Sequence, residues 1–270
     1  MFVKISEQPS LYDNLENESI PNLLEYINRE DHKIADAVQK ALPAIEKLVE
    51  GIVPRMKKGG RIIYVGAGTS GRLGVLDASE IPPTYGMEPG WVIGIIAGGD
   101  HALRNPVEKA EDSKEQAIAD IKALDLKPLD TVVGIAASGT TPYVISAVEY
   151  ARSIGCLTAG ITSNPEAPLS QAAEIAIETV VGPEFVTGSS RMKSGTAQKL
   201  VLNMISTVAM IKIGRVKGNR MVNMQLSNAK LVDRGTRMVM DEIGVDYDEA
   251  QRLLLLHGSV NNVILACKKG

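Results

Sequence analysis

The sequence predicts an α/β fold built on a doubly wound sheet of five parallel strands, with helical segments at both ends of the chain. Two observations lead to this prediction. Five short apolar runs lie between residues 61 and 181 and alternate with helical or loop segments, which is the pattern of right-handed βαβ crossovers. On either side of this region, apolar residues recur at helical spacing. A chain of 270 residues is long enough for one large domain of this kind with helical additions.

The N-terminal region is predicted to contain a helix that covers the sheet or packs on a partner. Apolar residues recur at helical spacing over 31–53, and Pro43 is the point at which this helix would kink. We expect an N-terminal helical segment over residues 1–52, a sheet domain over 53–222 and a C-terminal helical module over 223–270.

The five apolar runs are predicted to be buried strands, at 61–65, 91–97, 131–137, 157–162 and 175–181. The first strand leads directly into the glycine-rich stretch "GAGTSG" (66–71), and a helix is expected to begin near Ser70. Open parallel sheets bind ligands at the carboxyl ends of their strands. The loops that follow these strands are therefore the expected position of a functional site.

After Ser190 the pattern is helical throughout. A long helix is predicted to begin near Ser194, with one apolar stripe formed by Leu200, Val201, Met204, Ile205, Val208 and Ile211. Three shorter helices are expected at 225–243, 246–256 and 258–268. The last third of the chain is therefore predicted to be a helical cap or a small bundle.

Composition excludes several classes of protein. The net charge is −3 with both signs spread along the chain, so a basic surface for nucleic acid is not expected. The longest apolar runs are too short to span a membrane, and the N-terminus lacks the pattern of a signal peptide. Two cysteines, Cys156 and Cys267, form neither a disulfide framework nor a metal-binding cluster. These features predict a cytoplasmic protein that binds neither nucleic acid nor membranes.

Three loops combine glycine with hydroxyl side chains at predicted helix starts: residues 66–71, 137–142 and 187–196. Serine and threonine at such positions most often only cap a helix. Three similar loops at corresponding places favour a shared ligand, because small residues let the backbone approach and hydroxyl and N–H groups donate to phosphate or sugar oxygens. The pattern predicts a site for a sugar phosphate.

A dinucleotide site is the competing interpretation of the first loop. Gly66, Gly68 and Gly71 have the spacing of a dinucleotide-binding turn, and Asp100 follows the second strand as a candidate ribose ligand. However, Asp100 lies well beyond the usual distance of about 20 residues. A dinucleotide site would also not explain the hydroxyl-rich loops at 137–142 and 187–196. A sugar-phosphate site is therefore favoured.

Three blocks of the sequence, 59–86, 96–113 and 182–207, closely resemble the N-acetylmuramic acid 6-phosphate etherases, which are sugar-isomerase-type (SIS) domain proteins. The resemblance implies a SIS fold and a cytoplasmic homodimer without a metal or an organic cofactor. It also implies a lyase that uses water to cleave the D-lactyl ether at carbon 3, giving N-acetylglucosamine 6-phosphate and D-lactate during cell-wall amino-sugar recycling. In the open-chain sugar the hydrogen at carbon 2 is acidic, so lactate can be eliminated and water then added.

Glu80 and Glu111 match the two catalytic glutamates of the family. The resemblance implies that Glu80 protonates the departing lactate and that Glu111 handles the carbon-2 proton or the incoming water. Paired carboxyl groups suit this chemistry because it needs both an acid and a base. Glu80 is expected to end a short helix just before Pro82 and Pro83, which would let a loop turn it inward.

Further residues are predicted to bind the substrate from the three hydroxyl-rich loops: Thr69, Ser70, Ser138, Thr140, Thr141, Ser189, Ser190, Arg191 and Lys193. Arg191 and Lys193 could instead pair with aspartate or glutamate within the dimer. SIS sites often lie where subunits meet, so some residues are expected to act across a dimer interface. The main alternative function is a sugar-phosphate sensor without catalysis, like the related glucokinase regulatory protein. An aldose–ketose isomerase is a third possibility, which would need no acid for a leaving group at carbon 3.

Overall fold

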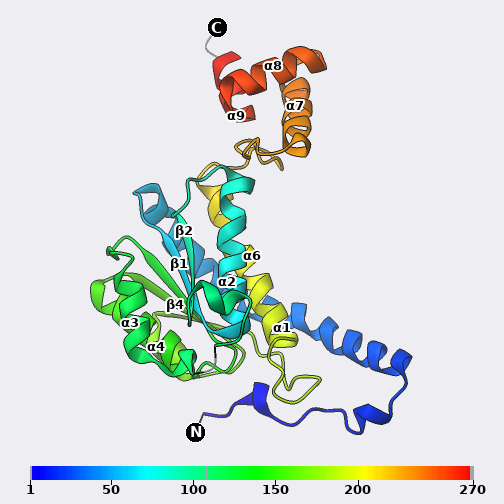
Figure 1. Ribbon diagram of the computed structural model, residues 1–270, viewed down its shortest axis with the longest axis vertical. Coiled ribbons are helices and arrows are strands. Elements are labelled where there is room, and N and C mark those ends of the chain that lie inside the picture. The colour runs from blue at the N-terminus through cyan, green and yellow to red at the C-terminus, as the bar shows by residue number, and fades with distance from the viewer. Residues whose placement is uncertain (1, 108, 268–270) are drawn as a thin grey trace. The chain divides into compact units, whose positions relative to one another are not determined.

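A single parallel sheet forms the centre of the protein in the computed structural model, which describes residues 2–107 and 109–267. Its strands have the order β2-β1-β3-β4-β5 (Figure 1). They span Ile62–Gly66 (β1), Val92–Ile96 (β2), Thr131–Ile135 (β3), Leu157–Thr162 (β4) and Ile175–Glu178 (β5). The predicted fold class and all five predicted strands are confirmed. The fifth strand is shorter than its apolar run, because the chain leaves the sheet after the backbone N–H of Thr179 binds the carbonyl of Thr162.

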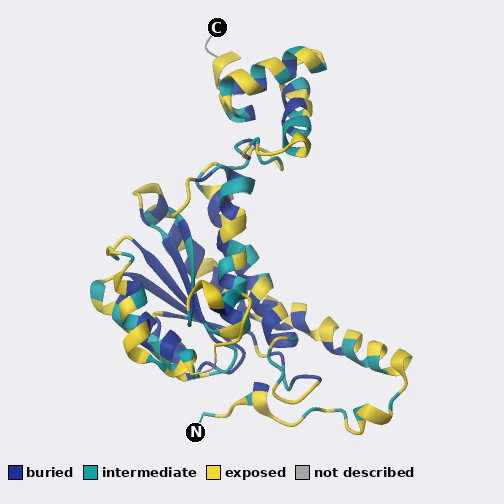
Figure 2. Ribbon diagram, in the orientation of Figure 1, coloured by how far each residue is buried: buried dark blue, intermediate teal, exposed yellow. Residues whose placement is uncertain are grey.

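The sheet is covered on both faces, and for this reason β1 and β3 are buried along their whole length (Figure 2). On one face lie α3 (Lys114–Lys122), α4 (Pro142–Ile154) and α5 (Pro168–Ala172). Their core with the sheet includes Ile63, Val65, Val132, Val144 and Leu169. The long helix α1 (Ile20–Lys57) packs against β4 and β5.

Helix α1 spans Ile20–Lys57 and is longer than the helix predicted over 31–53. Its start is set by Ser19, whose side chain accepts a hydrogen bond from the backbone of Asn22. The first turns carry few buried apolar residues, so hydrophobic periodicity alone missed them. Pro43 lies inside the helix and does not end it. No helix in the described ranges is both long enough and apolar enough to cross a membrane.

Helix α2 spans Gly68–Tyr85 and therefore continues past Glu80 and through Pro82 and Pro83. The expectation that the helix ends at Glu80 is wrong. The fixed φ of proline is itself compatible with a helix. The stop is supplied instead by Gly86, whose φ of +61° is left-handed and whose N–H binds the carbonyl of Pro82.

Helix α6 spans Lys193–Lys212 and confirms the predicted long helix, but its buried stripe differs from the predicted one. Val201 and Ile205 are buried as expected, whereas Val208 and Ile211 are 38% and 43% exposed. Ala209 and Met210 take the buried positions instead. Two apolar side chains of the predicted stripe are thus left at the surface.

The chain divides into two compact units, one of Met1–Ala78 and Val92–Ser206, the other of Ser79–Trp91 and Thr207–Gly270. The second unit contains α7 (Ala229–Ile243), α8 (Tyr247–His257) and α9 (Val260–Cys267), which agree with the three predicted helices. Lys268, at the end of the last predicted helix, lies outside the described residues. Val239, Leu254 and Val263 form the centre of this unit's own core. The functional domain boundaries at 52 and 222 stay a prediction.

Candidate active site

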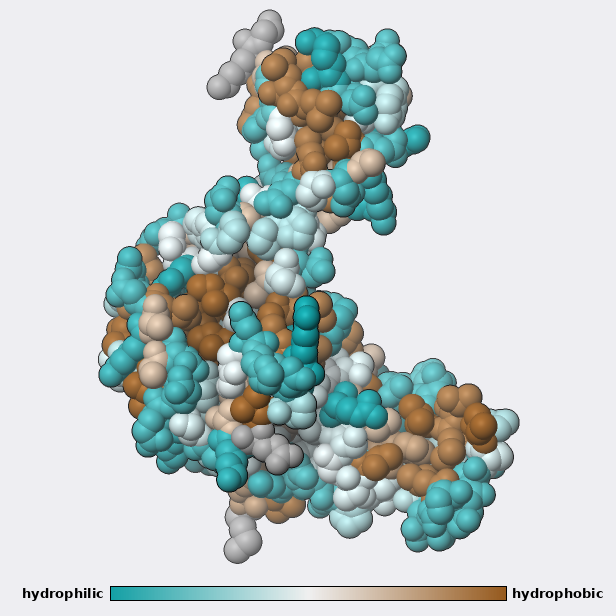
Figure 3. Space-filling view, in the orientation of Figure 1, coloured by the Kyte–Doolittle hydropathy of each residue, from teal (hydrophilic) through white to brown (hydrophobic). Residues whose placement is uncertain are grey.

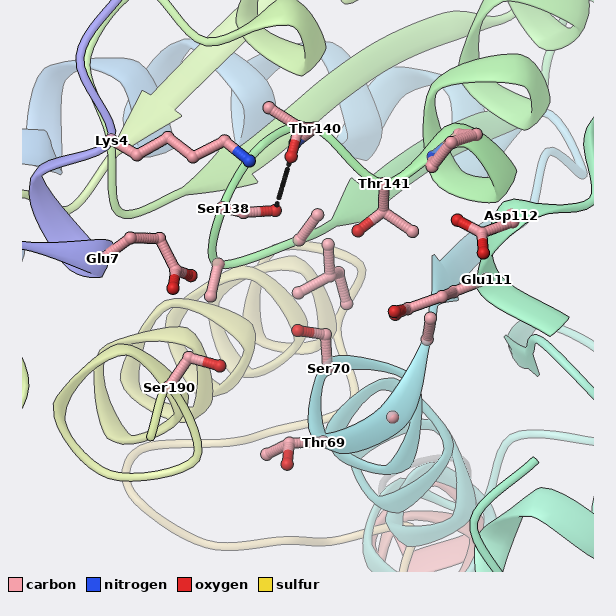
Figure 4. Close-up of a pocket in the computed structure, with 16 residues that line it drawn as sticks. Lys4, Glu7, Thr69, Ser70, Glu111, Asp112, Ser138, Thr140, Thr141 and Ser190 are labelled. Atoms are coloured by element: carbon pink, nitrogen blue, oxygen red, sulfur yellow. Dashed lines mark hydrogen bonds between the residues drawn. The ribbon is translucent and has the colours of Figure 1, made fainter. Parts of the chain in front are cut away.

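A cavity of about 680 Å³ lies in the first unit, at the carboxyl ends of β1 and β3 (Figure 4). In a sheet of this strand order, the crossovers from these two strands lead to opposite faces and leave a crevice between them. Polar side chains of the cavity come from five segments: Lys4, Glu7, Thr69, Ser70, Glu111, Asp112, Ser138, Thr140, Thr141 and Ser190. Six of the nine predicted substrate-binding residues therefore line one cavity.

The turn after β1 needs its glycines for two different reasons. A Cβ on Gly66 would lie 2.5 Å from the backbone nitrogen of Gly71, and one on Gly71 would lie 2.6 Å from Cγ1 of Ile96. Gly68 has a φ of +52°, which side chains rarely adopt. The turn is therefore tight, and it directs the N-terminus of α2, with Thr69 in its first turn, toward the cavity.

The loop after β3 gathers hydroxyl groups at the N-terminus of α4. Ser138 Oγ accepts hydrogen bonds from the backbone N–H and the hydroxyl of Thr140, at 3.2 and 3.1 Å (Figure 4). Thr141 is the N-cap residue of α4, yet its hydroxyl makes no capping hydrogen bond within the described part of the chain. The usual capping role thus does not account for Thr141. A helix N-terminus with hydroxyl donors around it favours an anion such as phosphate.

Ser70 has a structural contact as well as a place in the cavity wall. Its hydroxyl donates to Oε1 of Gln198 at 2.9 Å, and both residues are buried. This bond joins the first turn of α2 to the first turns of α6. Its proton is therefore already engaged, and its oxygen faces a ligand chiefly as an acceptor.

Glu111 and Asp112 occupy a short 3-10 turn, Ala110–Asp112. Lys109 enters this turn with a φ of +68°, a conformation that costs energy in a residue with a side chain. The carboxylate of Glu111 points into the cavity (Figure 4). Among the described residues, no group of three or more histidine, cysteine, aspartate or glutamate side chains is arranged to hold a metal ion.

A smaller cavity of about 180 Å³ shares Ala67, Gly68 and Glu111 with the main one. Its other lining residues are mostly apolar and come from the segment after β2: Ala97, Ala102, Pro106 and Val107, together with Arg72. The Arg72 guanidinium holds this segment by donating to the carbonyls of Ala102 and Leu103, at 2.7 and 2.9 Å. Glu111 thus stands where a polar and an apolar space meet.

Glu80 lies on α2, eleven residues after Thr69, and belongs to the second unit. Its side chain is exposed. It is absent from the described residues that line the cavity. Leu76, one turn earlier on the same helix face, is 49% exposed.

The third hydroxyl-rich loop contributes only Ser190 to the described lining of the cavity, so Ser189 and Arg191 are not placed there. Lys193, which was predicted to bind substrate, is also absent from the described lining of the cavity. Its ammonium is buried and lies 2.6 Å from Oε2 of Glu30 on α1. Lys193 thus pairs with an acidic residue of its own chain.

The pair between Lys193 and Glu30 is part of a buried network behind the third loop. Burial opposes ionisation of Glu30, but hydrogen bonds from Lys193 and Lys33 lower its pKa below the ordinary value. Glu184 accepts from the backbone N–H groups of Lys193 and Ser194, at 2.8 and 2.9 Å, and so caps α6 with a carboxylate. These contacts hold the loop in place beside the cavity.

Another carboxyl group, that of Asp77, lies partly buried on α2. Burial raises its pKa to about 6, although a hydrogen bond from the hydroxyl of Ser206 at 3.0 Å acts in the opposite direction. Asp77 does not belong to the described wall of the cavity. It joins α2 to α6 in the first unit.

Besides Asp112, the neighbour of Glu111, the sequence analysis missed two polar residues of the cavity, Lys4 and Glu7. They come from the N-terminal segment, which has no glycine-rich motif and follows no strand. No local pattern could have indicated them, because their place depends on contacts with residues more than 150 positions away.

Comparison with known proteins agrees with this architecture. Residues 44–152 match the family model for the glucokinase regulatory protein N-terminal SIS domain, and residues 107–208 match that for the SIS domain. A putative phosphosugar isomerase of Bacteroides fragilis involved in capsule formation has a similar structure, with a TM-score of 0.54 and 21% identity over 73% of this chain and 94% of that one. The structure of a phosphoheptose isomerase from Francisella tularensis is also similar, with a TM-score of 0.51 and 15% identity. That match covers 70% of this chain and 99% of the isomerase. The fold is therefore the predicted SIS fold.

Sequence relatives are much closer. A Bacteroides fragilis protein named N-acetylmuramic acid 6-phosphate etherase is 66% identical over 269 residues, covering 100% of this chain and 96% of the relative. Proteins of the same name from Porphyromonas gingivalis and Cronobacter sakazakii are 66% and 55% identical. The alignment with the Porphyromonas gingivalis protein covers 96% of this chain and 95% of the relative. The alignment with the Cronobacter sakazakii protein covers 90% of this chain and 82% of the relative.

Proposed function

Because this chain belongs to the family of N-acetylmuramic acid 6-phosphate etherases, we propose that the cavity at the ends of β1 and β3 holds this sugar phosphate for cleavage. The activity is that of a lyase, which separates D-lactate from carbon 3 of the sugar. The observation that carries the proposed site is the meeting of Glu111 with the hydroxyl-rich loops around one cavity.

The loop after β3 is proposed to bind the phosphate. Thr140 and Thr141 line the cavity at the N-terminus of α4, and Ser138 lies beside them. Thr69 approaches from the N-terminus of α2 and Ser190 from the third loop. Ser70 lines the cavity beside Thr69 and, because its proton is donated to Gln198, is proposed to accept a hydrogen bond from a hydroxyl group of the sugar. Hydroxyl groups and helix N-termini stabilise a phosphate dianion by hydrogen bonds and by the helix dipole. Ser189 and Arg191 remain proposed ligands from the same third loop.

The proposed reaction uses two carboxyl groups and water. A carboxylate removes the proton at carbon 2, next to the aldehyde of the open-chain sugar, and the electron pair of the carbon 3–oxygen bond leaves with lactate. A second carboxyl group protonates that oxygen. Water then adds to carbon 3, and a proton returns to carbon 2. Glu111 is proposed to remove the carbon-2 proton or to activate the incoming water, and Glu80 is proposed to protonate the departing lactate. These steps transfer protons only, so the proposal includes no redox cofactor.

Glu80 is proposed to act in the cavity of a partner subunit within a homodimer. It does not line the described wall of its own chain's cavity, and the helix face that carries it also exposes Leu76. Ile20 and Leu24 near the start of α1 are 74% and 63% exposed, where apolar side chains gather at the surface (Figure 3). Exposed apolar groups of this kind favour a contact with a second subunit.

Mixing two inactive variants tests the shared site. Glu80→Gln and Glu111→Gln homodimers should each release almost no lactate. In a mixed dimer, one site would have both glutamates intact and the other would have neither. Because random exchange makes half of the dimers mixed, roughly a quarter of wild-type activity should return. If no activity returns after subunit exchange has been verified by mass spectrometry, both glutamates act from the same chain and the shared-site proposal fails.

Release of D-lactate from N-acetylmuramic acid 6-phosphate by the purified protein tests the function itself. The alternative is a sugar-phosphate sensor. The match to the family model for the glucokinase regulatory protein N-terminal SIS domain supports this alternative. A sensor would bind the sugar phosphate without releasing lactate. A phosphorylated sugar does not cross a membrane unaided, so the proposal places the reaction in the cytoplasm.

A further inference from the structure

The N-terminal segment is fastened to the wall of the cavity by one buried side chain. Ser6 is fully buried, and its backbone N–H donates to Oδ1 of Asn164 at 2.9 Å. The amide nitrogen of Asn164 donates back to the hydroxyl of Ser6 at 2.9 Å. The same nitrogen contacts the carbonyls of Ala137 and Ser138, each at 3.1 Å. Asn164 therefore joins the N-terminal segment directly to the loop proposed to bind phosphate.

A second set of contacts holds the segment a few residues later. The hydroxyl of Ser10 donates to the carbonyl of Phe185 at 2.7 Å, and its backbone N–H donates to the hydroxyl of Thr187 at 2.9 Å. The ring of Tyr12 packs on that of Phe185, with centroids 5.0 Å apart. Tyr12 also donates to Glu30, at 3.1 Å. The segment is thus fixed at Ser6, between the two residues that reach the cavity, and again at Ser10 and Tyr12, beyond them.

Charge distinguishes Lys4 from the other residues of the cavity wall. Among the described lining residues, Glu7, Glu111 and Asp112 are acidic, and Lys4 alone is basic. The substrate carries a phosphate and a carboxylate, so three acidic groups would repel it without a compensating cation. In Figure 4 the ammonium of Lys4 points toward Ser138 and Thr140, on the opposite side of the cavity from Glu111.

We propose that Lys4 is a substrate-binding residue that pairs with the phosphate group and thereby makes the N-terminal segment part of the site. This inference rests on the proposed function, which puts the phosphate at the loop of Ser138 and Thr140. The reacting ether must lie near Glu111, across the cavity, so the anion within reach of Lys4 is the phosphate and not the lactyl carboxylate. The long side chain of lysine places a charge beside the hydroxyl donors of that loop.

The test compares Lys4→Met with Lys4→Arg and with the control Lys58→Met, which removes an exposed lysine at the end of α1. For Lys4→Met, KM for N-acetylmuramic acid 6-phosphate should rise about 10- to 100-fold, the usual effect of losing a hydrogen bond to a charged group. The inhibition constant of the product, N-acetylglucosamine 6-phosphate, should rise by a similar factor, because the product keeps the phosphate. The kcat should change little, Lys4→Arg should regain most of the affinity, and Lys58→Met should match wild type.

Two results would overturn the proposal. If neither constant changes in Lys4→Met, Lys4 does not contact the substrate. If KM rises while product inhibition is unchanged, Lys4 binds the lactyl carboxylate instead of the phosphate. Product binding can also be measured by calorimetry without turnover. A wild-type protein that binds the product but releases no lactate would contradict the proposed function. In that case the role of Lys4 would still be tested, by comparing product binding to wild type and to Lys4→Met.

Discussion

Replacing Glu111 with glutamine is expected to lower kcat for lactate release by about 10²- to 10⁴-fold, the range usual for loss of a general acid or base. Glutamine has nearly the same shape as glutamate but cannot accept a proton from carbon 2 or from water. The cavity and the loop proposed to bind phosphate should be unaffected, because Glu111 enters the cavity from a separate 3-10 turn. Inhibition by N-acetylglucosamine 6-phosphate should therefore remain near the wild-type value.

Glu115→Gln is the matched control for this change. Glu115 lies one turn further along the chain, in the first turn of α3, and is exposed. It should keep wild-type kcat and KM. Steady-state release of D-lactate measures both variants. If Glu111→Gln stays within a factor of ten of wild type while the control is normal, Glu111 is not the catalytic base, and the assignment drawn from the family resemblance is wrong.

Replacing Lys193 with methionine is expected to destabilise the protein by about 3–5 kcal/mol, because a buried carboxylate loses its buried partner and stays paired only with the half-exposed ammonium of Lys33. Lys193 and Glu30 are both nearly inaccessible and lie 2.6 Å apart. In Lys193→Met the carboxylate of Glu30 keeps its contacts with Lys33 and Tyr12. It loses its contact with the ammonium group of Lys193 on α6. The double variant Glu30→Gln/Lys193→Met should recover much of the loss, since no buried charge is then left without compensation.

Urea unfolding of the two variants and of Lys199→Met, an exposed lysine on the same helix, measures this effect. The control should lie within about 0.5 kcal/mol of wild type. The opposite pattern, normal stability with a raised KM in Lys193→Met, would mean that Lys193 binds substrate as the sequence analysis expected. It would contradict the buried pair seen in the structure.

The fold was largely predictable because its signals are local. Each strand is a short apolar run, and the turn after β1 carries glycines whose close approaches leave no room for a Cβ. The errors have local causes too. Pro82 and Pro83 suggested an end to α2, yet proline fits the backbone of a helix and the stop lies at Gly86.

The site was predictable only where it follows strand ends. Thr69 and Thr141 were found because the carboxyl ends of β1 and β3 meet at a crevice. Lys4 and the pairing of Lys193 could not be found in this way, because they depend on contacts between segments far apart in the sequence. Glu80 was placed by family resemblance alone, and we propose that it acts in the cavity of a partner subunit.

The fate of solvent oxygen tests the account most directly. When N-acetylmuramic acid 6-phosphate is cleaved in heavy-oxygen water, elimination followed by hydration predicts that the label enters N-acetylglucosamine 6-phosphate at carbon 3. D-Lactate should leave with its original ether oxygen and carry no label from this step. Mass spectrometry of both products distinguishes the outcomes. Label in the hydroxyl of lactate, with none at carbon 3, would show attack on the lactyl carbon and would contradict the proposed role of the carboxyl groups.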